Sequence, residues 1–346
     1  MNISPSDRIL VTGATGLVGS HVVQQAKKRG YLVRAMVRSL DDSDCLAAWG
    51  TEKVVASLED ANSLKKAVEG ITIVVHCAAM VGDWGPTDQY RAVNVEGTKA
   101  LLDAAVQTGC LKRWIQISSL GVYPGTDHYG TDESTPASTK GIDGYTLTKV
   151  ESENVILDAI KQRQLPAVIL RPGFIYGPRD RTVMPRLLQR LQAGRFAYLG
   201  NTDKLMNNTF VGNLCEAIWL AIGNDDVVGE VFNIRDGRAV TKQAFIDTIC
   251  QAANLKKPTK VVPFVVAKFL AWHLETAYKL FGIQSAPLVN SARIKFLGRN
   301  LDFDISKAAS RLGYRPSVKF EDAMSESVKW FFAEGEGRSD CSSDID

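Results

Sequence analysis

The chain has 346 residues, 45% of them hydrophobic and 23% charged, and this composition is typical of a folded globular protein rather than a disordered or fibrous one. Its 41 Lys and Arg residues nearly balance its 38 Asp and Glu residues, and the basic residues are scattered, so the net charge of +3 argues against a nucleic-acid partner. A chain of this length forms about two domains.

The sequence shows no signal for secretion or for metal binding. Its first seven residues are polar and lead directly into an apolar run, without the basic and apolar regions of a signal peptide. The cysteines lie far apart, with no C-x-x-C pair and no histidine at zinc spacing; they are Cys45, Cys77, Cys110, Cys215, Cys250 and Cys341. We therefore expect a cytoplasmic protein with reduced thiols and no metal site.

Short β-branched runs alternate with longer helical patterns through the first half of the chain. The predicted strands cover residues 9–11, 32–37, 54–55, 73–76, 114–117 and 167–170. The predicted helices cover residues 17–29, 62–69, 90–108 and 143–162. This alternation predicts repeated βαβ units and therefore an α/β fold with a doubly wound parallel sheet.

The first predicted strand leads into a glycine-rich loop and then into a helix. Glycine permits the tight turn at position 13, the close approach of a pyrophosphate at position 16 and close packing of helix on strand at position 19. The N-terminus of the helix offers free N–H groups to phosphates. The spacing predicts a dinucleotide bound by Gly13, Thr15, Gly16, Leu17, Val18 and Gly19.

The end of the second predicted strand distinguishes the two nicotinamide cofactors. A carboxylate there binds the ribose 2′-hydroxyl, whereas an arginine accommodates a 2′-phosphate. Arg38 stands at this position, and the first acidic residue after it is Asp41. We therefore favour NADP(H), with NAD(H) as the alternative if Arg38 is only a solvated surface residue.

Three residues predict a site for carbonyl reduction or alcohol oxidation. Tyr145 and Lys149 are four residues apart in a predicted helix and so share one face, where a cation favours ionisation of a tyrosine and suits it to acid–base catalysis. Ser119 follows the fifth predicted strand, at the sheet edge where ligands bind, and is placed to polarise a substrate oxygen. Ser118 is the less favoured alternative to Ser119.

The pattern becomes irregular after Arg171, where prolines at 172, 178 and 185 interrupt it. We predict a dinucleotide-binding domain over residues 1–175, with return segments near 205–235, and a smaller, mostly helical substrate-binding region over residues 176–333. The polar residues 334–346 are predicted to be a disordered tail.

Residues 261–281 are strongly apolar over 21 positions, but Lys268, His273, Glu275 and Lys279 make a membrane-spanning helix too costly. Two interpretations remain open. One is a buried helix or lid, and the other is an amphipathic helix that rests on a membrane or on an apolar substrate.

Six ordered motifs run along nearly the whole chain: Gly13-x-x-Gly16-x-x-Gly19, Val75-His76-Cys77-Ala78-Ala79, Asn94-Val95-Glu96-Gly97-Thr98, Ser118-Ser119-x-x-Val122-Tyr123, Tyr145-x-x-x-Lys149 and Arg171-Pro172-Gly173-x-x-Tyr176-Gly177-Pro178. Together they resemble the extended short-chain dehydrogenase/reductases of the NAD-dependent epimerase/dehydratase superfamily. The resemblance implies a Rossmann fold in which Ser119, Tyr145 and Lys149 are catalytic.

The same resemblance extends the cofactor site beyond the glycine loop and Arg38. It implies a cleft lined by Ser57, Leu58, Ala78, Ala79, Asn94, Ile117, Tyr145, Lys149, Pro172, Phe174 and Ile175. One departure concerns adenine: many relatives carry Gly-Asp-Leu where this chain has Ala56-Ser57-Leu58, so that a hydroxyl replaces a carboxylate.

The motifs also indicate a branch of the family. Nucleotide-sugar enzymes typically have an asparagine where this chain has Phe174, and an arginine in the later strand where it has Met206-Asn207-Asn208, which disfavours a nucleotide-sugar substrate. Segments 79–86, 171–174 and 303–308 instead look like the 3β-hydroxysteroid dehydrogenase-like branch, which includes sterol-processing enzymes and β-keto-acid reductases. This implies a hydrophobic alcohol or ketone bound by Val81, Trp84, Ser119 and Phe174.

The leading hypothesis is therefore an NADP(H)-dependent oxidoreductase that interconverts a secondary alcohol and a ketone on a sterol-like or β-keto/β-hydroxy acyl substrate. One alternative is a nucleotide-sugar epimerase or dehydratase, although Leu120 and Gly121 stand where dehydratases have their acid and base. Another is a non-catalytic NADPH-sensing protein. The resemblance also implies a homodimer formed by the helices near 94–108 and 143–162.

Overall fold

The computed structural model describes residues 3–4, 6–40, 44–140, 143–283, 285–287 and 289–335. The predicted disordered tail falls outside these residues, except for Glu334 and Gly335 at the end of the last helix. Asp41 and Cys341 also lie outside them.

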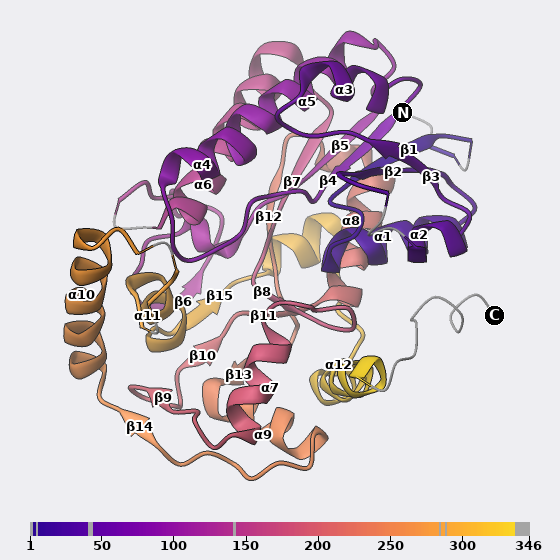
Figure 1. Ribbon diagram of the computed structural model, residues 1–346. Coiled ribbons are helices and arrows are strands. Elements are labelled where there is room, and N and C mark those ends of the chain that lie inside the picture. The colour runs from indigo at the N-terminus through magenta and orange to yellow at the C-terminus, as the bar shows by residue number, and fades with distance from the viewer. Residues whose placement is uncertain are drawn as a thin grey trace.

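Seven parallel strands form the central sheet, in the order β12-β7-β5-β4-β1-β2-β3 (Figure 1). They are β1 (Arg8–Thr12), β2 (Leu32–Val37), β3 (Glu52–Val55), β4 (Ile73–His76), β5 (Arg113–Ile117), β7 (Ala167–Pro172) and β12 (Val231–Ile234). All six predicted strands belong to this sheet. The prediction of an α/β fold with a doubly wound parallel sheet is confirmed.

Helices cover both faces of the sheet. Successive side chains of a strand point to opposite faces, so Ile9 and Val11 of β1 join one hydrophobic core and Leu10 joins the other. The first core packs against α1 (Leu17–Lys28) and α8 (Val211–Gly223). The second packs against α3 (Ala61–Ala67), α5 (Gly97–Gln107) and α6 (Gly144–Arg163). The sheet is therefore buried on both sides, as parallel sheets generally are.

Two further helices lie between strands of the central sheet. Helix α2 (Asp44–Ala48) leads into β3. Residues 90–108, predicted as one helix, form the end of α4 (Thr87–Arg91), a π-helical turn at Ala92–Glu96 and α5. The π turn was not predicted, because a wider turn leaves the apolar spacing of the flanking helix nearly unchanged.

The second region lies beyond the carboxyl ends of the strands (Figure 1). Its strands pair in twos: β6 (His128–Thr131) with β15 (Leu301–Phe303), β8 (Phe174–Tyr176) with β11 (Asn208–Phe210), β9 (Tyr198–Leu199) with β14 (Val261–Val262) and β10 (Leu205–Met206) with β13 (Val240–Thr241). Its helices are α7 (Met184–Gln192), α9 (Lys242–Ala252), α10 (Phe264–Leu280), α11 (Ser291–Gly298) and α12 (Phe320–Gly335). Aromatic side chains, including Tyr176, Phe210, Phe245 and Phe320, form their shared core.

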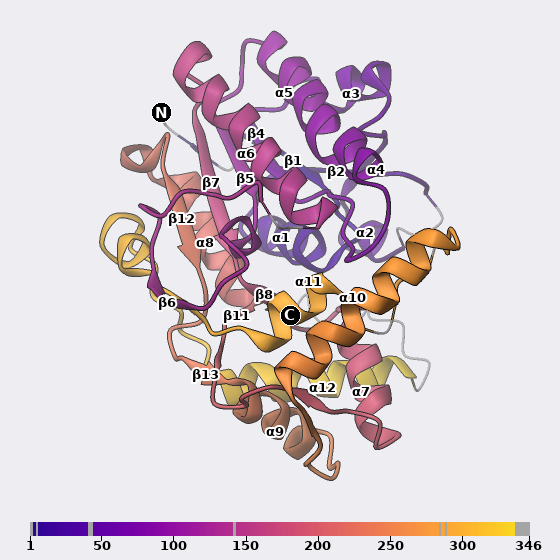
Figure 2. The same ribbon diagram turned by 90° about the vertical axis from the view of Figure 1, so that its left-hand side faces the viewer.

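Helix α10 stands at the edge of the molecule, outside α11 (Figures 1 and 2). Of its side chains, Ala267 and Ala271 are buried, whereas Phe269 is 65% exposed and Trp272 is 63% exposed. The interpretation of residues 261–281 as a buried helix is therefore wrong. None of the helices in the described ranges is long and apolar enough to cross a bilayer.

A buried ion pair joins the sheet to α6. Glu153 accepts two hydrogen bonds from the Arg171 guanidinium, at 2.9 Å from Nε and 2.6 Å from Nη2, and both side chains are under 10% exposed. The remaining Nη1 donates to the Tyr123 hydroxyl at 2.9 Å, and that hydroxyl donates to Asn233 Oδ1. The network therefore joins β7, α6 and β12 near the carboxyl ends of the strands.

We predict that Glu153→Ala destabilises the protein by about 3–5 kcal/mol, because it leaves the Arg171 charge buried and uncompensated. Asp103→Ala is the control, since its partner Arg163 is 47% exposed and surface pairs contribute about 1 kcal/mol or less. Urea unfolding measures both. Equal losses in the two variants contradict the prediction.

Candidate active site

The glycine-rich loop lies at the carboxyl end of β1, where its backbone passes close to the end of β4. Gly13 has a φ of +64°, and a Cβ there would lie 2.9 Å from the Ala78 nitrogen. A Cβ at Gly19 would lie 2.1 Å from the Gly13 carbonyl oxygen. No side chain caps the N-terminus of α1, so its first N–H groups face the loop. This cradle of backbone fits the pyrophosphate of a dinucleotide.

Thr12 holds the loop against β4. Its hydroxyl accepts hydrogen bonds from the backbone nitrogens of Cys77 and Ala78, each at 3.1 Å, and lies 2.8 Å from His76 Nδ1. His76 Nε2 lies 3.0 Å from the Thr98 hydroxyl on α5. Burial, with a smaller contribution from the charge of Lys149, lowers the pKa of His76 to about 3. His76 is therefore a neutral structural link.

Arg38 and Ser57, which we expect to bind the adenosine half of the cofactor, lie beside this loop. Arg38 directly follows β2 and its side chain is exposed, so its guanidinium is free to meet a phosphate. The Ser57 hydroxyl accepts a hydrogen bond from the Glu59 nitrogen at 3.3 Å, and Leu58 packs beneath it in the core. Ser57 thus keeps its hydroxyl proton available to an acceptor on a base.

The structure brings Ser119, Tyr145 and Lys149 together at the carboxyl ends of β5 and β7. The side chains of Ser119 and Tyr145 are hydrogen-bonded to each other. Lys149 Nζ donates to the Ile117 carbonyl oxygen at 2.8 Å and lies 5.9 Å from the centroid of the Tyr145 ring. The Ser118 hydroxyl is buried and has no hydrogen-bond partner among the described residues.

The surroundings of Tyr145 keep it protonated. Burial, together with the charge of Asp143, raises the pKa of Tyr145 to about 12, although its hydrogen bond with Ser119 lowers it. Burial lowers the pKa of Lys149 to about 8, against the opposing effects of Cys77 and Glu153. At neutral pH Tyr145 therefore holds a proton that it can donate, and Lys149 is mainly charged.

Asn94 connects three elements around the trio from the π-helical turn. Its Oδ1 accepts from the Met80 nitrogen at 2.7 Å, and its Nδ2 donates to the Met80 carbonyl oxygen and the Thr148 hydroxyl, each at 3.0 Å. Thr148 lies between Tyr145 and Lys149 in sequence. Asn94 therefore fixes α6 against the segment that follows β4.

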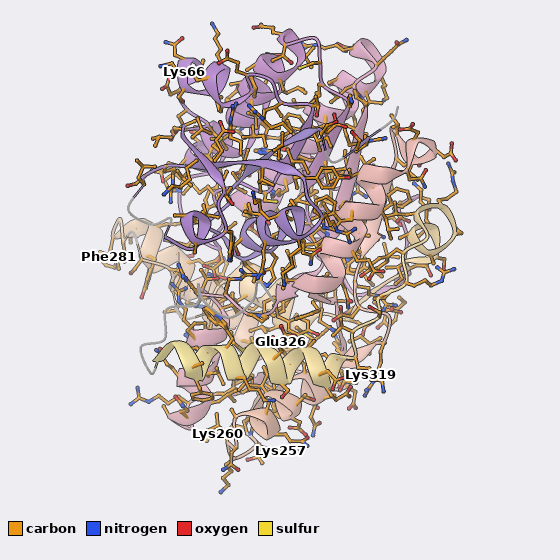
Figure 3. The ribbon with its side chains drawn as sticks, turned by 90° about the vertical axis from the view of Figure 1, so that its right-hand side faces the viewer. Lys66, Lys257, Lys260, Phe281, Lys319 and Glu326 are labelled. Carbon is orange, nitrogen blue, oxygen red and sulfur yellow. The ribbon has the colours of Figure 1, made fainter. Side chains whose placement is uncertain are left out.

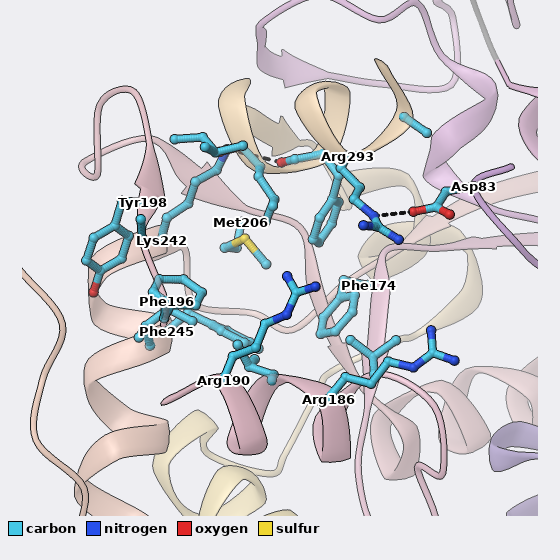
Figure 4. Close-up of a pocket in the computed structure, with 18 of the residues that line it drawn as sticks. Asp83, Phe174, Arg186, Arg190, Phe196, Tyr198, Met206, Lys242, Phe245 and Arg293 are labelled. Atoms are coloured by element: carbon cyan, nitrogen blue, oxygen red, sulfur yellow. Dashed lines mark hydrogen bonds and ion pairs between the residues drawn. The ribbon is translucent and has the colours of Figure 1, made fainter. Parts of the chain in front are cut away.

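A cavity of about 420 Å³ opens beside Tyr145 (Figure 4). Its walls come from β8, α7, β9, β10, α9 and α11, and most of its lining is apolar: Phe174, Val183, Leu187, Phe196, Met206, Phe245, Ile246, Phe296 and Leu297. Phe174 is the centre of an aromatic cluster, with its ring centroid 5.2 Å from that of Phe296 and 5.8 Å from that of Phe245. The cavity can therefore enclose a hydrophobic molecule.

A few charged groups interrupt the apolar lining. Figure 4 shows Arg186 and Arg190 extending from α7, with Arg190 directed between Met206 and Phe174. Neither arginine forms an ion pair with any residue that the structure describes. Across the cavity, Arg293 of α11 donates from Nε to Asp83 Oδ2 at 2.5 Å (Figure 4).

Two lysines hold α11, which forms one wall of the cavity, in place. Lys242 Nζ donates to the carbonyl oxygens of Phe296 at 3.1 Å and Leu297 at 2.5 Å, near the C-terminus of α11. Burial, aided by the charge of Lys204, lowers the pKa of Lys242 to about 7. Lys295 Nζ donates to the Gly121 carbonyl oxygen at 2.7 Å, which ties α11 to the segment after Ser119.

Sequence reasoning found part of this cavity. Of the four predicted substrate-binding residues, Phe174 lines the cavity, whereas Val81, Trp84 and Ser119 lie outside its lining. Trp84 instead packs its ring edge-on against Tyr278 of α10 and donates to the Ile283 carbonyl oxygen at 3.3 Å. The α7 residues were missed, although Val183, Leu187 and Arg190 follow the spacing of one helix face. Residues from α9 and α11 carry no comparable signal.

Comparisons with known proteins find one matching family model and several relatives. The model of the NAD dependent epimerase/dehydratase family matches residues 9–234. A 2-alkyl-3-oxoalkanoate reductase of Shewanella oneidensis is 30% identical over 326 residues, which cover 91% of this chain and 84% of the relative. A 3-beta-hydroxysteroid dehydrogenase of Mycolicibacterium neoaurum is 30% identical over 338 residues, which cover 94% and 91%.

A solved structure extends the likeness to the fold. The UDP-glucuronic acid 4-epimerase of Bacillus cereus, in complex with NAD, superimposes with a TM-score of 0.76 at 22% identity, covering 94% of this chain and 99% of that one. At that identity the likeness concerns the fold alone.

We predict that Gly19→Ala weakens the binding of NADPH and NADH by more than about tenfold, because its Cβ would displace the Gly13 carbonyl and deform the cradle. Gly223→Ala at the end of α8 is the matched control, since its Cβ would meet nothing within 4 Å. Fluorescence titration measures the affinities, and thermal unfolding confirms that both variants fold. Unchanged affinity in a folded Gly19→Ala variant contradicts the prediction.

Proposed function

This chain belongs to the NAD dependent epimerase/dehydratase family, and on that premise we propose that it is an NADP(H)-dependent oxidoreductase that interconverts a secondary alcohol and a ketone on a hydrophobic substrate. The observation that carries the proposal is the position of Tyr145, which belongs to the Ser119–Tyr145–Lys149 cluster and also lines the apolar cavity. A carbonyl held there meets a protonated acid on one side and the dinucleotide cleft on the other.

Each residue of the cluster has a distinct role. In the reductive direction Tyr145 donates its proton to the substrate oxygen, and Ser119 donates a hydrogen bond to the same oxygen. Lys149 binds the ribose of the cofactor, and its positive charge favours the tyrosinate that remains after proton transfer. The bound nicotinamide supplies the hydride for reduction or accepts it for oxidation.

The cavity supports an apolar substrate that carries an acidic group. Burial of apolar surface stabilises binding by about 25 cal/mol per Å². Arg186 and Arg190 place two cations at the same cavity, where they can hold a carboxylate. We therefore favour a β-keto or β-hydroxy acid over a neutral sterol, in keeping with the relative from Shewanella oneidensis, which is named for a 3-oxoalkanoate.

The two alternatives have less support. A nucleotide-sugar epimerase or dehydratase needs polar groups around its sugar, but Phe174 and Met206 present apolar surface to the cavity. A non-catalytic NADPH-sensing protein does not require Ser119, Tyr145 and Lys149 to be assembled beside a cavity. The homodimer through α5 and α6 and the cytoplasmic location stay predictions.

We predict that Tyr145→Phe lowers kcat by more than about a hundredfold while NADPH affinity is unchanged, because only the proton-carrying hydroxyl is lost. The assay follows NADPH oxidation with a long-chain 3-oxo acid and with a 3-ketosteroid. Tyr129→Phe is the control, since Tyr129 is 77% exposed.

Three outcomes of this assay decide between the functions. Full activity of Tyr145→Phe contradicts the mechanism. Product formation without net NADPH consumption favours an epimerase, and NADPH binding without turnover on either substrate favours a sensor.

We predict that Arg38→Ala lowers NADPH affinity by more than about tenfold and leaves NADH affinity unchanged, because only NADPH carries the 2′-phosphate that Arg38 meets. Lys28→Ala, at the exposed end of α1, is the control for a general loss of positive charge. Fluorescence titration with both cofactors measures the effect. Wild-type protein that binds NADH as tightly as NADPH contradicts the prediction and makes Arg38 a solvated surface residue.

A further inference from the structure

Helix α10 exposes large apolar side chains along the face opposite to its buried alanines. At 100° per residue, Val265, Phe269, Trp272 and Leu280 lie across the helix from Ala267 and Ala271. Their exposed fractions are 77%, 65%, 63% and 79%. Phe281, which follows the helix, is 75% exposed and projects at the edge of the molecule in Figure 3. A cluster of large exposed apolar side chains on one helix face marks an interaction site.

The same segment has a higher net positive charge than the whole chain. Residues 256–283 contain five lysines and one acidic residue, Glu275, a net charge of +4 against +3 for the whole chain. Glu275 is engaged locally, because it accepts from the Ser291 nitrogen and hydroxyl. Lys268 and Lys279 are exposed on one flank of the apolar face. In the segment before α10, Lys260 projects from the surface, and Lys257 is paired with Asp247 at 3.1 Å (Figure 3).

This apolar face adjoins elements that wall the substrate cavity. At the N-terminal end of α10, β14 pairs with β9, whose Tyr198 and Leu199 line the cavity. At the C-terminal end, Trp84 packs against Tyr278 and is the neighbour of the cavity residue Asp83. Helix α11, which packs against α10, supplies the wall between these two ends.

We propose that α10 is a docking surface for the anionic face of a lipid bilayer. Its apolar side chains enter the boundary between headgroups and acyl chains, while Lys268 and Lys279 extend to lipid phosphates. Lysines near such a surface each contribute about 1 kcal/mol of attraction. The helix then lies in the plane of the membrane, and the protein takes up apolar substrates from the lipid phase.

The charge pattern distinguishes a lipid surface from a second copy of the chain. In an antiparallel twofold pairing of α10 helices, the lysine-bearing flanks of the two copies face each other, with Lys268 of one near Lys279 of the other. Like charges on facing flanks oppose the pairing. An anionic bilayer instead matches both the apolar face and its basic flank.

Vesicle flotation of the full chain tests the proposal, with phosphatidylcholine vesicles that contain phosphatidylglycerol and with phosphatidylcholine alone. We expect flotation mainly with the anionic vesicles, weakened by salt. Val265→Ser/Phe269→Ser should weaken it by more than about tenfold by removing buried apolar area, and Lys268→Glu/Lys279→Glu should do so by reversing the charge. The controls are Tyr129→Ser, another highly exposed apolar side chain, and Lys329→Glu, an exposed lysine on α12.

Thermal unfolding confirms that the variants fold, so the test is independent of cofactor binding and turnover. If the wild-type protein floats with neither type of vesicle, the proposal is overturned. The same holds if Val265→Ser/Phe269→Ser floats as the wild-type protein does. A dimer in solution that the same variant dissociates, without vesicle binding, also overturns it and assigns the face to a second copy. Loss of turnover with intact flotation affects only the proposed oxidoreductase function.

Discussion

The close approach of the Gly13 backbone to Ala78 is the constraint on which the rest of the site depends. The chain adds β2 and β3 on one side of β1 and β4, β5 and β7 on the other, so the sheet order reverses between β1 and β4. Open parallel sheets bind their ligands at such a reversal. Here Thr12 closes the gap by accepting two hydrogen bonds from the backbone that directly follows β4, and only glycine at position 13 leaves room for them.

The parts of this arrangement that follow from local pattern were predictable from the sequence. β-branched runs set the strands, glycine spacing set the loop, and a four-residue interval placed Tyr145 and Lys149 on one helix face. The contacts that depend on distant packing were not predictable. Lys149 donates to Ile117 rather than to Tyr145, and the π-helical turn that carries Asn94 leaves no mark in the apolar spacing.

The substrate region was harder to predict for a physical reason. Its cavity is assembled from six short elements, and each contributes between one and four side chains, so no single stretch carries a signal. An apolar residue in such a stretch also looks the same whether it fills a core or lines a cavity. Phe174 was identifiable only because it follows the Arg171-Pro172-Gly173 motif, in which a Cβ at Gly173 would collide with the Asn207 carbonyl oxygen.

Helix α10 shows how apolar composition alone misleads about burial. Its length and hydrophobicity resemble those of a core helix, yet its contact with the protein runs mainly along Ala267 and Ala271, whose small side chains bring it close to α11. The α11 wall does not need the outer face of α10, because Lys242, Lys204 and Lys295 already bind its backbone or the segments beside it. Polar residues at Phe269 and Trp272 would serve that packing equally well. Packing within the protein therefore does not explain their large apolar side chains. The basic flank beside them favours a bilayer, which offers anionic headgroups next to apolar acyl chains.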